Sequence, residues 1–141
     1  MEQRDYILRE IEKIGTILSA IWQKIFGGKD NPAISPEKQI ENARGMLLNE
    51  TDFDLDKFLE LNIENSNEYI CSFNGFNVEN IELLAGCIFQ IGLNDNDSSK
   101  KYLEKALQLY NLCNIKSKTY SFEREANIQV IKNKIYIINV N

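Results

Sequence analysis

Residues 6–26 read YILREIEKIGTILSAIWQKIF, and this stretch decides the class of fold. An α-helix places residues that recur at alternating intervals of four and three on one face. The stretch therefore predicts a long amphipathic N-terminal helix, which Gly27 and Gly28 end because glycine accepts the left-handed conformation of a C-cap. Its aliphatic face, called the seam below, consists of Ile7, Ile11, Ile14, Leu18, Ile21 and Ile25.

Three uses of the seam are open. It can pack on the rest of its own domain, form a helix interface with a second copy or another helix, or lie on a membrane surface. Trp22, Lys24 and Phe26 suit a membrane surface, but the acidic net charge of −5 does not. We expect packing within the domain, with a homodimer as the alternative.

Helix-starting residues and apolar stripes alternate along the rest of the chain. Ser35 followed by Pro36 is typical of a helix start, because serine caps free backbone N–H groups and proline suits the first turn. Two prolines and seven glycines in 141 residues suit long helices. Further helices are expected over about 35–49, 54–61, 68–73, 78–92, 98–112 and from 121 onward.

The expected fold is therefore all-α, with antiparallel helical hairpins in a single helical domain over 1–141. Its parts are the N-terminal amphipathic helix (1–28), a helical middle (35–76), and a hairpin plus C-terminal helix (77–141). The tail 136–140 also reads as a strand, which we rank second.

Residues 80–110 resemble one tetratricopeptide (TPR) unit. Ala85-Gly86 followed by Phe89 resembles the small and aromatic positions of that motif's first helix, and YLEKAL at 102–107 resembles the hallmark of its second. The resemblance implies a TPR-like hairpin with a groove that binds a protein or peptide. The groove-facing positions that it implies are Asn80, Leu83, Cys87 and Gln90.

Two further segments, DYILREIE at 5–12 and SKTYSFER at 117–124, carry a wider resemblance. The whole chain is similar to an uncharacterised bacterial family of small TPR-like helical proteins. That resemblance implies the fold and no assigned activity.

Composition excludes several kinds of chemistry. The chain has no histidine, which removes the commonest general base and most zinc and haem sites. Acidic turns begin at Asp52 and Asp95, but neither run has the glycine or the final glutamate of a calcium loop. The sequence accordingly predicts no metal site, no cofactor and no catalytic residue.

The cysteines and the net charge indicate the cellular compartment of the protein and the partners that it does not bind. Cys71, Cys87 and Cys113 are odd in number, widely spaced and flanked by apolar residues, which is typical of buried thiols in a reducing compartment. We therefore expect a cytoplasmic protein. The acidic balance repels phosphate backbones, so nucleic-acid binding is not expected.

These observations favour a non-catalytic TPR-like module for protein–protein interaction. The alternative is a structural protein that dimerises through the seam of the N-terminal helix.

Overall fold

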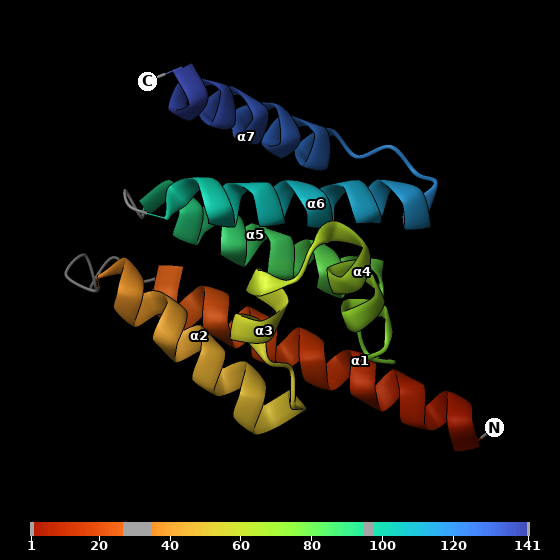
Figure 1. Cartoon of the computed structure of the whole chain (residues 1–141). Helices are drawn as coiled ribbons and strands as arrows, with labels where there is room; N and C mark the ends of the chain where they lie inside the picture. Colours follow the sequence, from red (N-terminus) through yellow and green to blue (C-terminus); the bar gives the residue numbers. More distant parts are fainter. Residues whose placement is uncertain (1, 27–34, 95–97, 141) are drawn as a thin grey trace.

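The computed structural model describes residues 2–26, 35–94 and 98–140, which form helices joined by turns, with no strand among them (Figure 1). This confirms the all-α prediction. In chain order the elements are α1 (Glu2–Ile21), the π-helical turn η1 (Trp22–Phe26), α2 (Pro36–Thr51), α3 (Leu55–Glu60), α4 (Ile63–Cys71), α5 (Val78–Asn94), α6 (Ser99–Ser117) and α7 (Phe122–Val140).

Polar side chains begin four of these helices where the sequence places helix starts. In each, a side-chain oxygen accepts a hydrogen bond from the backbone N–H three residues on, at 3.0–3.2 Å. Such a bond satisfies one of the N–H groups that the first helical turn leaves free. The capping residues are Ser35, Asp54, Asn77 and Ser121.

Two helix starts differ from the sequence prediction. Helix α4 starts earlier than expected, because Asn62 caps it by accepting a hydrogen bond from the Asn65 N–H at 2.7 Å. The side chain of Ser98 makes no capping bond at the start of α6. Helix α7 continues to Val140, which confirms the helix that we rank first for the tail over the alternative strand. The predicted C-cap at 27–28, the linker 29–34 and the turn at 95–97 lie outside the described residues.

The long helices form a stack in which each packs against the next in the order α7, α6, α5, α1 and α2 (Figure 1). The short helices α3 and α4 lie beside this stack and contact α6. Helix α7 is the outermost layer on one side, with only α6 packed extensively against it. In the part of the chain that the structure describes, no helix has the length and apolarity needed to cross a membrane.

An aromatic cluster fills the space between the stack and the short helices. Phe53 is fully buried at its centre, and its ring lies 5.1–5.5 Å from its four aromatic neighbours. Rings at such separations attract one another through their edges and faces in addition to burying apolar area. The neighbours are Phe58, Tyr69, Phe73 and Phe76.

Helix α1 docks on the turn before α5 through backbone contact. A Cβ atom on Gly75 would lie 2.6 Å from the Glu10 carbonyl oxygen, so only glycine allows this approach. The buried Asn80 amide donates to the Ile11 carbonyl at 2.9 Å and to the Gly75 carbonyl at 2.7 Å. These two bonds join α1 to the start of α5.

The α5–α6 pair forms the most extensive helix–helix contact among the described elements. Ala85 and Ala106 are fully buried, and a Cβ on Gly92 would lie 3.1 Å from Leu103 Cδ2. Small residues at a helix crossing let the two backbones approach closely. This hairpin carries α7 on one side and α1 on the other.

Candidate functional site

A groove of about 1200 Å³ runs between α5 and α7, closed at its ends by η1 and by the α6–α7 connection. Its floor is apolar, with Leu83 39% exposed and the Trp22 ring 36% exposed. Gly86 keeps the floor open, because a Cβ there would meet Tyr110 Oη at 3.7 Å and Trp22 Cζ3 at 4.0 Å. The groove is therefore a concave surface with exposed apolar side chains, the usual character of a binding site.

Arg124 builds one wall of the groove. It lies on the buried face of α7, where its Nε donates to Glu82 Oε1 of α5 at 2.8 Å. Its Nη1 donates to Asn114 Oδ1 at 2.9 Å, Ser117 Oγ at 3.2 Å and the Thr119 carbonyl at 3.3 Å. The guanidinium is thus committed to holding α7 and its connection in place, which fixes the width of the groove.

Tyr110 forms part of the groove floor. Its hydroxyl accepts a hydrogen bond from Asn127 Nδ2 of α7 at 3.2 Å. Burial raises the pKa of Tyr110 to about 12, so the hydroxyl is neutral at physiological pH. This contact adds a second link between the floor and the α7 wall.

Four polar side chains at the rim have no ion pair or hydrogen bond to the described residues. Two are carboxylates and one is an amine, so the rim carries a small excess of negative charge. Groups of this kind are free to meet a ligand without breaking a contact within the chain. They are Glu79, Gln90, Lys116 and Glu123.

The groove positions implied by the TPR resemblance divide into two pairs. Leu83 and Gln90 line the α5–α7 groove. Asn80 and Cys87 do not, because they are only 4% and 3% exposed. Asn80 faces α1, which covers this side of α5, and burial raises the pKa of the Cys87 thiol to about 12. Their assignment to an open groove is therefore wrong in this structure.

The seam of the first helix is also divided. Its C-terminal half is buried in the chain's own core, whereas Ile11 is half-buried and Ile7 is 38% exposed. The side chain of Ile25 lies outside the described residues. The seam as a whole is thus not available as an interface with another chain, because its inner half supports α2 and α5. The buried seam residues are Ile14, Leu18 and Ile21.

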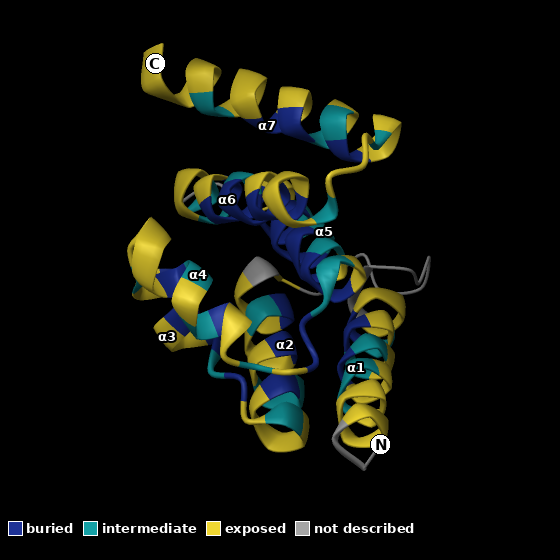
Figure 2. Cartoon of the chain, turned by 90° about the vertical axis from the view of Figure 1, so that its right-hand side faces the viewer, coloured by how far each residue is buried: buried dark blue, intermediate teal, exposed yellow. Residues whose placement is uncertain are grey.

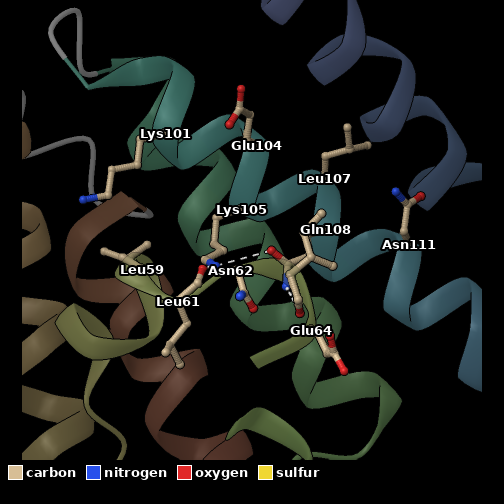
Figure 3. Close-up of a pocket in the computed structure, with 11 residues that line it drawn as sticks. Leu59, Leu61, Asn62, Glu64, Lys101, Glu104, Lys105, Leu107, Gln108 and Asn111 are labelled. Carbon is tan, nitrogen blue, oxygen red and sulfur yellow. Dashed lines mark hydrogen bonds between the residues drawn. The ribbon is translucent and has the colours of Figure 1, made fainter. Parts of the chain in front are cut away.

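A second cleft, of about 690 Å³, lies between α6 and the α3–α4 junction (Figure 3). Figure 3 shows the long side chains of Lys105 and Gln108 pointing from α6 toward Asn62 and the junction. Lys101 of α6 forms an ion pair with Glu60 of α3 beside this cleft, and the rim residue Glu104 pairs with Lys100.

The polar groups at the base of this cleft are already satisfied. Lys105 Nζ donates to the Leu61 carbonyl at 2.7 Å and lies 4.9 Å from the Phe58 ring centroid. Gln108 donates to Ser66 Oγ and to the Ile63 carbonyl. Burial lowers the pKa of the Lys105 amine. These side chains bond to the carbonyl groups at the end of α3 and hold the α3–α4 junction on α6, so the polar groups of this cleft stabilise the fold.

Sequence analysis missed the residues that shape the groove, Trp22, Glu82 and Arg124. The sequence contains one signal that points to Arg124. Arg124 continues the inward spacing of Ile128 and Ile131 on α7, and a charge on an apolar stripe requires a buried partner. The identity of that partner, Glu82, depends on how α7 crosses α5, which spacing within one helix does not encode.

No group of three or more histidine, cysteine or acidic side chains that could hold a metal ion occurs among the described residues. Comparison of the chain with protein-family models, with curated proteins and with solved structures found no match.

Proposed function

We propose that this protein is a non-catalytic, TPR-like interaction module that binds a peptide segment of another protein in the α5–α7 groove. The observation that carries the proposal is the groove itself, whose floor exposes Trp22 and Leu83 and whose α7 wall is held in place by Arg124. The tight α5–α6 hairpin and its resemblance to a TPR unit support the same function.

The lining of the groove indicates the chemistry of the peptide. Trp22 and Leu83 offer an apolar surface that an aliphatic or aromatic side chain can cover. Glu79 and Glu123 at the rim outnumber the single amine of Lys116, which favours a lysine or arginine on the peptide. We therefore propose a segment with an apolar anchor beside a basic residue, met in the cytoplasm.

Two features of the groove support a binding role without catalysis. Its buried guanidinium is committed to four acceptors, and burial raises the pKa of its tyrosine to about 12, further from neutral pH. A nucleophile or general base would need a group poised near neutral pH. Self-association through the first helix is the weaker candidate, because the inner half of the seam is buried in the chain's own core.

The test is selection from a random displayed peptide library, followed by titration of selected peptides. Trp22 is the single tryptophan and lines the groove, so its fluorescence reports peptide binding directly. We expect selected peptides to combine an apolar anchor with lysine or arginine and to change that fluorescence. Leu83→Arg should weaken binding by at least about tenfold, since it places a charge where the apolar anchor would pack.

The matched control is Leu48→Arg, which changes an exposed leucine on α2, away from the groove. It should bind peptides like the wild-type protein. Equal affinity of the Leu83→Arg and Leu48→Arg variants, or selected peptides without a basic residue and an apolar anchor, would contradict the proposal.

A further inference from the structure

The outer face of α7 carries exposed apolar side chains that no described part of the chain covers. Phe122 is 83% exposed and Tyr136 is 68% exposed, and Ile137 and Val140 are exposed beside them. Figure 2 shows the exposed side of α7 turned away from α6, with its buried residues on the opposite side. Phe122 stands at one end of this face, and Tyr136, Ile137 and Val140 gather at the other end, where they form an exposed apolar patch of the kind that marks an interaction surface.

This face has the spacing of a helix-pairing surface. Its central positions recur at intervals of four and three residues, the spacing that keeps one face of a helix against a partner helix. Six residues occupy these central positions, and all of them are exposed and uncharged. They are Phe122, Ala126, Gln129, Asn133, Tyr136 and Val140.

Charged residues border this face in a pattern that selects its partner. Glu123 and Lys134 share one edge, and Glu125 and Lys132 share the other, because each pair is separated by close to a whole number of helical turns. Both pairs have the same midpoint, between Ile128 and Gln129. Neither lysine forms an ion pair with a described residue, and Glu125 accepts only a long bond from Gln129, at 3.5 Å.

We propose that the outer face of α7 binds a second copy of this chain, with the two α7 helices antiparallel about a two-fold axis at Gln129. Rotation about such an axis brings each edge against the same edge of the second copy, running in the opposite direction. Glu123, which also borders the α5–α7 groove, then faces Lys134 of the second copy, and Glu125 faces Lys132. One helix pair thus forms four ion pairs with no like charges opposed.

The uncharged positions match in the same register. An axis at Gln129 sets Phe122 of one copy beside Tyr136 of the other, twice in each dimer, because both lie seven residues from the axis. The two Gln129 amides meet at the axis, where each can donate to the other, as polar residues in helix pairs fix register. The parallel arrangement would oppose glutamate to glutamate and lysine to lysine, which disfavours it.

The experiment measures the association state of the full chain by sedimentation equilibrium, with circular dichroism to monitor folding. We expect a wild-type dimer and a folded monomer for Tyr136→Glu. Ile63→Glu is the matched control, since Ile63 is similarly exposed at 66% but lies on α4. It should remain dimeric.

Charge reversal tests the orientation. The double variants Glu123→Lys/Glu125→Lys and Lys132→Glu/Lys134→Glu should each dimerise at least about tenfold more weakly, because attractive pairs become repulsive. A mixture of the two should form heterodimers, and the four substitutions together in one chain should restore the homodimer. A monomeric wild type, a dimeric Tyr136→Glu variant, or charge reversal without effect would overturn the proposal.

Discussion

Replacing Gly75 with alanine tests how α1 is held on the rest of the fold. The new methyl group would lie 2.6 Å from both the Glu10 carbonyl oxygen and Ile14 Cδ1. Favourable contact between such atoms begins at roughly 3.5 Å. Ile14 is buried and Glu10 contributes backbone, so neither can turn aside, and α1 must move as a whole.

The expected loss of stability follows from two opposing effects. Forcing a methyl group into a packed contact costs about 1–3 kcal/mol. The backbone of Gly75 does not have positive φ, so alanine adopts it and restricts the unfolded chain, which offsets the loss by about 0.4–1 kcal/mol. We expect a net destabilisation of about 1–2 kcal/mol, which lowers the Tm by roughly 3–7 °C for a chain of this size.

Urea unfolding followed by circular dichroism measures this change. Gly45→Ala is the matched control, because Gly45 lies inside α2 and a Cβ there meets nothing within 4 Å. It should stabilise the protein by about 0.5–1 kcal/mol through the better helix propensity of alanine. If Gly75→Ala is as stable as the wild type, α1 does not lie on this turn and the stacking order described here is wrong.

Three further predictions concern buried side chains. Asn80→Ala should cost about 2–3 kcal/mol in urea unfolding, because it removes one buried and one part-buried hydrogen bond and leaves a cavity between α1 and α5. A loss smaller than about 1 kcal/mol, the usual cost of removing one helix cap, would contradict this reasoning. Ala106→Leu should destabilise the protein by about 1–3 kcal/mol, because Ala106 is fully buried at the α5–α6 crossing. Unchanged stability would show that the crossing has room for a larger side chain and would contradict the close packing of α5 and α6. A thiol reagent at neutral pH should modify the exposed Cys71 at once, but Cys87 and Cys113 only after the protein unfolds. Burial raises the pKa of both of these thiols to about 12, so almost none of the reactive thiolate is present. Rapid labelling of all three cysteines would contradict the burial of Cys87 and Cys113.

The sequence alone determined where most helices begin and which residues can share a face. Ser35, Asp54, Asn77 and Ser121 mark helix starts because a cap is a local interaction, formed between residues three apart. The early start of α4 was missed, although Asn62 carries the same chemistry. A short helix has too few apolar positions to show its period, so its cap was the only signal.

Only the tertiary structure decided which faces are covered. Ile7 and Ile14 occupy equivalent positions in one heptad pattern, yet one is exposed and the other buried. Leu83 and Cys87 lie one helical turn apart on α5, yet Leu83 is exposed and Cys87 is buried. Periodicity defines a face within a single helix, whereas burial depends on where a distant segment crosses it. That crossing is set by contacts such as Gly75 against the Glu10 backbone, between residues far apart in the chain.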